Sequence, residues 1–156
     1  MSVQQIFLAP LGSVIEYSDG NPRPPERHRK KLAAWRSRNS SGRLIRKRAE
    51  RRVGNTLIGA SFTLHAGDFD SGGLVVLRVH RTFSADSDLK LVVTERPKAG
   101  SVRVLDRPGE EAELVYLAAH RADAEGWLTR HGYPDALLDE VTAHTEAADT
   151  VEGRAA

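Results

Sequence analysis

The sequence predicts an α+β fold: a largely antiparallel β-meander of about five to seven strands, packed against one basic helix and a C-terminal helix pair. Between residues 56 and 118, apolar and polar residues alternate in short runs that recur about every ten residues, with turn-forming residues between them. Such spacing is typical of antiparallel strands. On both sides of this region, apolar residues recur at helical spacing. We expect one domain over residues 1–145 and a flexible tail over residues 146–156, which are mostly small and polar.

The N-terminal region is predicted to contain two short strands and one helix. Residues 3–9 and 13–17 have the composition of strands and are separated by a Pro-Leu-Gly break. A helix is predicted from about Pro25 to Arg38, because proline suits the first helical position and the following glutamate faces the positive end of the dipole. The inward stripe of this helix consists of His28, Leu32 and Trp35. The run Asn-Ser-Ser-Gly at residues 39–42 is predicted to end it.

The middle of the chain is predicted to form the sheet. Residues 43–48 fit either a strand or a further helical turn. Aspartate, glycine and serine at residues 68–73 indicate a turn. The predicted strands cover residues 56–66, 74–83, 89–95, 102–105 and 113–118.

The C-terminal region is predicted to form two short helices. Asp123 is a candidate N-cap for the first of them, and Trp127 lies on its apolar side. Gly132 occupies the position of a left-handed helix end of the Schellman type. The second helix is predicted over residues 135–143, with its leucines and valine facing inward.

Composition excludes several classes of protein. The chain has no cysteine, which rules out disulfides, thiolate zinc sites, cysteine nucleophiles and the Cys-ligated zinc deaminases. No apolar run approaches the roughly 20 residues of a membrane span, so we expect no membrane partner. The N-terminus lacks the basic and long apolar regions of a signal peptide, which favours a cytoplasmic location. No phosphate-binding glycine loop is present, and no cofactor is predicted.

The charge of the chain is concentrated in one segment. Residues 23–52 hold thirteen Lys and Arg residues and two Glu, a net charge of +11, whereas the whole chain has a net charge of only +2. The last third of the chain, residues 104–156, is strongly acidic. Concentrated like charge repels itself and destabilises a fold unless an anion lies against it. The segment therefore predicts either an anionic partner or docking on the acidic C-terminal part of the same chain.

The leading hypothesis is a small non-enzymatic protein that binds nucleic acid or another polyanion, such as an acidic protein surface, through this Arg-rich segment. Ten of its thirteen cations are arginines, whose guanidinium groups match phosphate oxygens in geometry. The residues expected to contact nucleic acid are Arg23, Arg27, Lys30, Lys31, Arg38, Arg43, Arg46, Lys47, Arg48, Arg51 and Arg52. A hairpin formed by residues 56–66 and 74–83 would bring His65, Arg78 and His80 to one polar face, with Arg103 extending it. Such a face could be a platform for single-stranded nucleic acid, but an ordinary solvated face of an antiparallel sheet is the preferred interpretation.

Two alternatives remain open from the sequence. A small metal-dependent nuclease or phosphodiesterase would use oxygen and imidazole ligands to activate water. Its candidate ligands are His65, Asp68, Asp70 and His80, although aspartate in a Gly/Ser-rich turn is also ordinary turn chemistry. The other alternative is a protein-interaction module whose opposite charged poles drive self-association into a homo-oligomer.

Overall fold

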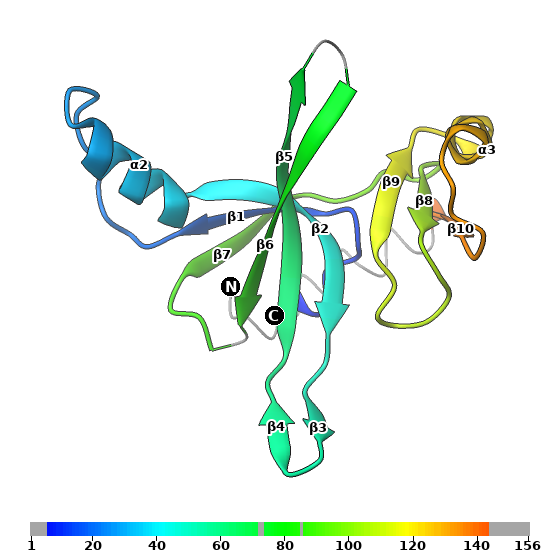
Figure 1. Ribbon diagram of the computed structural model, residues 1–156, viewed down its shortest axis with the longest axis horizontal. Coiled ribbons are helices and arrows are strands. Elements are labelled where there is room, and N and C mark those ends of the chain that lie inside the picture. Colours follow the sequence, from blue (N-terminus) through cyan, green and yellow to red (C-terminus); the bar gives the residue numbers. More distant parts are fainter. Residues whose placement is uncertain (1–5, 72–73, 85, 144–156) are drawn as a thin grey trace.

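The computed structural model describes residues 6–71, 74–84 and 86–143, and for residues 67–71 and 74–78 it describes the backbone alone. Two antiparallel sheets, one separate hairpin and two helices make up this part of the chain (Figure 1). The elements are β1 (Val14–Ser18), α2 (Arg29–Arg38), β2 (Ser40–Arg48), β3 (Arg51–Val53), β4 (Thr56–Ile58), β5 (Ser61–Ser71), β6 (Leu74–Ser84), β7 (Lys90–Glu95), β8 (Val102–Leu105), β9 (Leu114–Ala118), α3 (Arg121–Arg130) and β10 (Leu137–Glu140).

The predicted α+β class with mostly antiparallel strands is confirmed, but the strands do not form one meander. The first sheet has the order β6-β5-β2-β1-β7, and the second has the order β10-β8-β9. β3 and β4 form a two-stranded hairpin that extends away from both sheets (Figure 1). The described residues contain ten strands, more than the five to seven predicted. The chain leaves the first sheet after β7 and builds the second from the strands that follow.

Each sheet has its own apolar core. The first is built around residues of β1, β2 and β5 that are almost completely buried, such as Ile15, Leu44 and Leu64. The second lies between β8 and α3 and contains Val102 and Trp127. A third cluster consists of Ile45, Leu105, Ala112 and Leu114, and it joins β2 of the first sheet to the strands of the second. The two sheets therefore share apolar contacts and pack as one body.

The helix predicted over residues 25–38 begins four residues later than expected. Pro25 accepts a hydrogen bond from the amide of His28 at 3.0 Å, which closes a turn, and the helix starts only after His28. Leu32 is the buried residue of α2, and the indole Nε1 of Trp35 donates to the carbonyl of Asn21 at 2.8 Å. In Figure 1 the helix extends outward from the end of the first sheet. It therefore covers little of the sheet on which it was predicted to pack.

The end of α2 also differs from the prediction, because Asn39 ends the helix and residues 40–42 already belong to β2. Gly42 is needed for packing instead: a Cβ atom there would lie 2.9 Å from the Cβ of Leu64 and 3.0 Å from the carbonyl oxygen of His65. Residues 43–48, for which the sequence left strand and helix open, continue strand β2.

Three predicted segments near the first sheet need correction. Residues 6–9 form no strand, because Ile6 is helical and residues 7–9 form a turn and a bend, while residues 1–5 lie outside the described part. The strand predicted over residues 56–66 is divided, because β4 ends at Ile58 and β5 begins at Ser61. The turn predicted over residues 68–73 is wrong for residues 68–71, which continue β5 in its ladder with β6. Pairing within the β5–β6 hairpin therefore overrides the turn preference of Asp68 and Asp70.

The predicted C-terminal helix pair is wrong in its second half. Residues 137–140 form β10, which pairs antiparallel with β8. Asp139 faces Arg103 across this ladder and binds its guanidinium at 2.9 Å. The Schellman ending is also absent, since His131 ends α3 in an extended conformation. The predicted tail over residues 146–156 lies outside the described residues.

Candidate functional site

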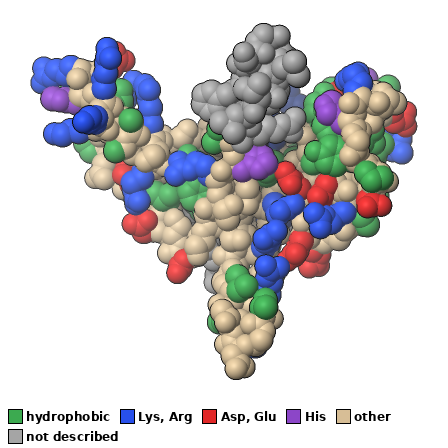
Figure 2. Space-filling view, viewed as in Figure 1, with side chains coloured by type: hydrophobic (Ala, Val, Ile, Leu, Met, Phe, Trp, Pro, Cys, Tyr) green, Lys and Arg blue, Asp and Glu red, His purple; other side chains and the backbone are tan. Residues whose placement is uncertain are grey.

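Helix α2 presents a dense group of exposed cations. Half of its ten residues are Lys or Arg, and all five of these side chains are exposed. Figure 2 shows Lys and Arg side chains gathered on and around this helix. Among the residues that the structure describes, only Arg38 of these five forms an ion pair, with Asp88 at 3.2 Å and Asp19 at 3.4 Å. The other four cations of α2 have no ion pair within the described part of the chain: Arg29, Lys30, Lys31 and Arg36.

Two further predicted residues lie just before α2 and are also exposed. Arg23 contacts Glu26 at 3.4 Å, a surface pair that contributes little stability. The Nε–H of Arg27 points to the imidazole of His28 at 3.2 Å. Both guanidinium groups are open to solvent, so they extend the cationic surface of the helix.

The C-terminal end of α2 is held by Arg81 of β6. Its guanidinium donates to the carbonyl of Ser37 and to the hydroxyl of Tyr17, the latter at 2.9 Å. The same group lies over the rings of Tyr17 and Phe83, 5.5 Å from each centroid.

Asn39 adds a second anchor, because its amide donates to the carbonyl of Trp35 at 2.8 Å and to Asp19 at 3.0 Å. Hydrogen bonds that the Asp19 carboxylate accepts from Asn21 and Asn39 lower its pKa, with a smaller effect from Arg38. The helix is thus fixed at one end and open along its length.

The predicted cations on β2 are placed differently, because they point into the protein. Arg43 donates to the carbonyl of Gly12 at 2.6 Å, and the Lys47 ammonium donates to two carbonyls, those of Phe7 and Ala9. Arg46 contacts Glu113 at 3.0 Å. It also lies 3.9 Å from Asp106 of the acidic C-terminal part.

The structure thus contains part of the docking on the acidic C-terminal part that the charge pattern suggested, and we call the contacts of Arg46 with Glu113 and Asp106 the internal clamp. Desolvation acts to raise the pKa of Asp106, but hydrogen bonds from Arg107 and Glu113 and the charge of Arg46 outweigh it and lower that pKa. The carboxylate therefore stays ionised beside Arg46. Only part of the Arg-rich segment is engaged in this way.

The last predicted cations lie on or near the β3–β4 hairpin. Arg48 is half-buried at the end of β2, Arg51 pairs with Glu111 at 3.6 Å, and Arg52 is exposed. The hairpin also exposes three large apolar side chains: Val53 and Leu57, each 56% exposed, and Ile58, 40% exposed. A narrow ribbon with cationic and apolar side chains therefore protrudes opposite α2 along the first sheet (Figures 1 and 2).

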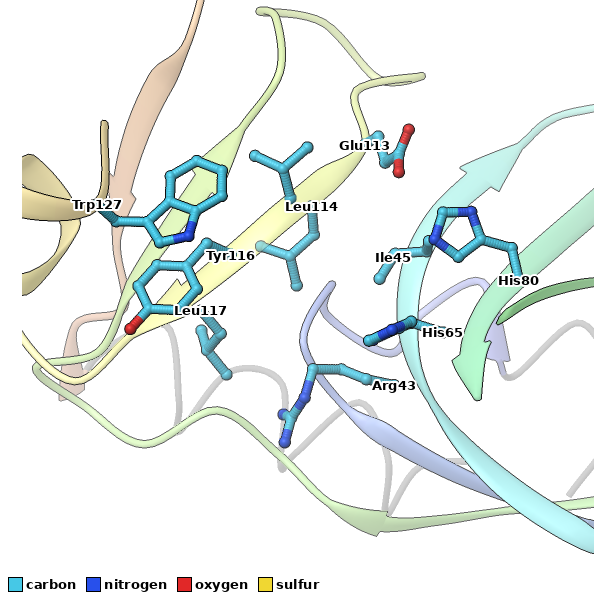
Figure 3. A pocket seen from close by; sticks show the side chains of 10 residues that line it. Arg43, Ile45, His65, His80, Glu113, Leu114, Tyr116, Leu117 and Trp127 are labelled. Atoms are coloured by element: carbon cyan, nitrogen blue, oxygen red, sulfur yellow. The ribbon is translucent and has the colours of Figure 1, made fainter. Parts of the chain in front are cut away.

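A cleft of about 350 Å³ lies between the two sheets (Figure 3). The first sheet contributes Arg43, Ile45, His65 and His80 to its lining. From the second sheet and α3 come Glu113, Leu114, Val115, Tyr116, Leu117 and Trp127. The cleft is thus built from segments that are up to 84 residues apart in sequence, Arg43 and Trp127.

The residues proposed as metal ligands are only partly brought together. His65 and His80 are cross-strand partners on β5 and β6, with ring centroids 5.7 Å apart. Asp68 and Asp70 belong to β5, and their side chains lie outside the described part. Among the side chains that the structure does describe, no three His, Asp or Glu residues are placed to hold a metal ion.

The predicted polar sheet face is present in part. β5 and β6 pair as expected, which places His65 and His80 on one face, but Arg103 is buried in the second sheet beside Asp139. The side chain of Arg78 is outside the described part. The sequence analysis did not predict that Glu113 and Tyr116 line the same cleft as these histidines. Local sequence patterns do not indicate which strands of two different sheets face each other.

The geometry defines a two-sheet α+β protein with an exposed cationic helix and a cleft between its sheets. A family model described as Uncharacterised conserved protein UCP036055 matches residues 1–145, and the chain belongs to this family. No curated protein and no solved structure matches the chain. In the described part of the chain, no helix has the length and apolarity that crossing a membrane requires.

Proposed function

We propose that this protein binds nucleic acid or another polyanion through the exposed cations of α2, with the β3–β4 hairpin as a second contact. The observation that carries the proposal is the group Arg29, Lys30, Lys31 and Arg36, which are exposed on one helix and have no ion pair among the described residues. Natural surfaces usually intersperse charges of both signs, and a single-sign field is suited to steering an oppositely charged partner.

The internal clamp does not account for this group. Glu113 and Asp106 lie beside Arg46, and Glu111 lies beside Arg51, so the acidic C-terminal residues that are described meet the second half of the Arg-rich segment. The first half remains on a helix that extends into solvent (Figure 1). Phosphate oxygens are a suitable partner, because guanidinium and ammonium groups bind them and release condensed counterions.

The hairpin favours nucleic acid over an acidic protein surface. A two-stranded β-ribbon fits the major groove of duplex DNA, and minor-groove proteins insert apolar side chains between base steps. Arg52 supplies charge on this ribbon, while Val53 and Leu57 supply exposed apolar surface at its end. Acidic peptides offer the charge but no base steps against which such side chains can pack.

Binding to a fluorescently labelled duplex across a salt series tests the proposal. If about six phosphates are neutralised, the slope of log K against log salt is expected to be near −5. Polyglutamate added as a competitor distinguishes nucleic acid from an acidic protein surface as the partner. If the partner is nucleic acid, polyglutamate should displace the duplex only at a large excess. Absence of binding at low salt, or an affinity that does not change between low and physiological salt, would overturn the proposal.

A further inference from the structure

The cleft between the sheets has two chemically different walls (Figure 3). One wall carries N–H donors from β2, β5 and β6: Arg43, His65 and His80. The opposite wall is apolar and aromatic: Leu114, Tyr116, Leu117 and Trp127. A ligand that satisfies both walls needs an anionic or strongly accepting group at one side and a flat, weakly polar ring at the other.

The donor wall is a row that crosses three neighbouring strands. Arg43 faces His65 in the β2–β5 ladder, and His65 faces His80 in the β5–β6 ladder. Residues directly opposite in antiparallel strands point to the same face. The guanidinium of Arg43 is fixed by one hydrogen bond to Gly12, and a guanidinium has five N–H groups, so further donors are left for a ligand. The two imidazole rings lie edge to face with centroids 5.7 Å apart, and an imidazole carries at least one N–H group.

The aromatic wall is equally well fixed. Tyr116 stacks on Trp127 with centroids 5.1 Å apart and an interplanar angle of 5°. Its hydroxyl lies 3.1 Å from both carboxylate oxygens of Asp123. Burial, followed by this contact with Asp123, raises the pKa of the Tyr116 phenol, so the hydroxyl stays protonated and continues to donate. The ring is therefore held in one orientation, as a stacking surface must be.

Glu113, the acidic residue in the lining, does not oppose an anionic ligand strongly. Its carboxylate is 3.0 Å from the guanidinium of Arg46, which offsets its charge. The volume of the cleft, about 350 Å³, falls in the range of roughly 300–1,000 Å³ that small-molecule sites occupy.

We propose that the cleft binds one nucleotide unit, with its phosphate on the row Arg43–His65–His80 and its base against the wall that includes Tyr116 and Leu117. Base stacking on aromatic side chains tolerates any base, because every base has a π-face. If the bound nucleotide is an unpaired residue of a nucleic-acid strand, this inference rests on the proposed function. A free nucleotide offers the same chemistry, and the two sources are separated experimentally.

Calorimetric titration of the full chain with AMP, adenosine and inorganic phosphate tests this site. We expect AMP to bind at least about tenfold more tightly than adenosine or phosphate alone, because only AMP meets both walls. Combining His65→Ala with His80→Ala should weaken AMP binding by about tenfold or more, since hydrogen bonds from the imidazole N–H groups to a charged phosphate are lost, while adenosine binding stays unchanged. His28→Ala, at the start of α2 and outside the cleft, is the matched control and should bind AMP as the wild type does.

Three results would overturn the site: no AMP binding at millimolar concentration, phosphate binding as tightly as AMP, or unchanged AMP affinity in the double variant. If the double variant melts earlier than the wild type, His80→Ala alone, at an exposed position, provides the same comparison. A variant of α2 lacking three cations should keep AMP binding, and its loss there would assign the nucleotide to the helix.

A single-stranded hexanucleotide distinguishes the two sources. Competition between the hexanucleotide and AMP supports a site for an unpaired residue of a strand. AMP binding without such competition supports a site for free nucleotide. If no oligonucleotide binds at any salt concentration but AMP binds as expected, the proposed function fails and the cleft remains a nucleotide site.

Discussion

Replacing Trp127 by alanine is expected to lower the free energy of unfolding by about 3–5 kcal/mol. The indole is only 6% exposed and lies against Val102, Val104 and Ala124 in the core of the second sheet. Its ring also stacks on His131, with centroids 4.0 Å apart. Truncation would remove these contacts and leave a cavity that the strands cannot fill without moving. Chemical denaturation monitored by far-UV circular dichroism measures the change.

Trp35→Ala is the matched control, because it removes the other tryptophan of the chain from a half-buried position on α2. Its expected loss is below about 2 kcal/mol, since α2 contributes only Leu32 to the buried residues. A loss below about 1 kcal/mol for Trp127→Ala would show that this ring does not support the second sheet, and equal losses for the two variants would contradict the described packing.

Replacing Lys30, Lys31 and Arg36 by alanine is expected to weaken duplex binding on the order of a hundredfold at about 0.15 M salt. Each phosphate contact that is lost removes about 0.7 from log K at this salt concentration, and the salt slope should become less negative by about 2.7. Alanine keeps helix propensity high, so the helix itself should persist. Removal of like charges from one helix should leave stability unchanged or raise it slightly. Fluorescence anisotropy across a salt series measures both effects.

The matched control replaces Lys98, Arg121 and Arg130 by alanine, which lowers the net charge equally at exposed positions near the second sheet. This control should keep most of the affinity and a salt slope close to that of the wild type. Equal loss of binding in both variants would mean that net charge alone, rather than the arrangement of cations on α2, determines the interaction.

Strands with strong alternation could be predicted from the sequence, because their pattern does not depend on which partner they find. β8 was predicted with its observed bounds, and β6 to within one residue. The short apolar run containing Leu137, Leu138 and Val141 fits a helix and a strand equally in spacing. The run forms a strand because it pairs with the edge of β8, some 30 residues earlier in the sequence, and because Asp139 binds Arg103 across this β8–β10 ladder.

The candidate site was predictable only where it depends on a single ladder. That His65 and His80 share a face follows from one hairpin pairing, and the structure confirms it. The neighbours of these histidines depend on how two sheets pack, and the Arg46–Glu113 pair joins positions 67 residues apart. The total charge of the Arg-rich segment was evident from composition. Its division into exposed cations on α2 and inward-pointing cations on β2 required the register of β2 between β1 and β5.

Lysine footprinting tests the central claim, that α2 is the surface that contacts nucleic acid, most directly. The chain has five lysines, and Lys30 and Lys31 lie on α2 whereas Lys90 and Lys98 lie elsewhere on the surface. Acetylation rates of each lysine, measured by mass spectrometry with and without saturating duplex, report which ammonium groups become covered. The account predicts that acetylation of Lys30 and Lys31 slows several-fold while Lys98 reacts at its original rate. Unchanged rates at Lys30 and Lys31 in fully bound protein, or protection confined to Lys90 and Lys98, would contradict it.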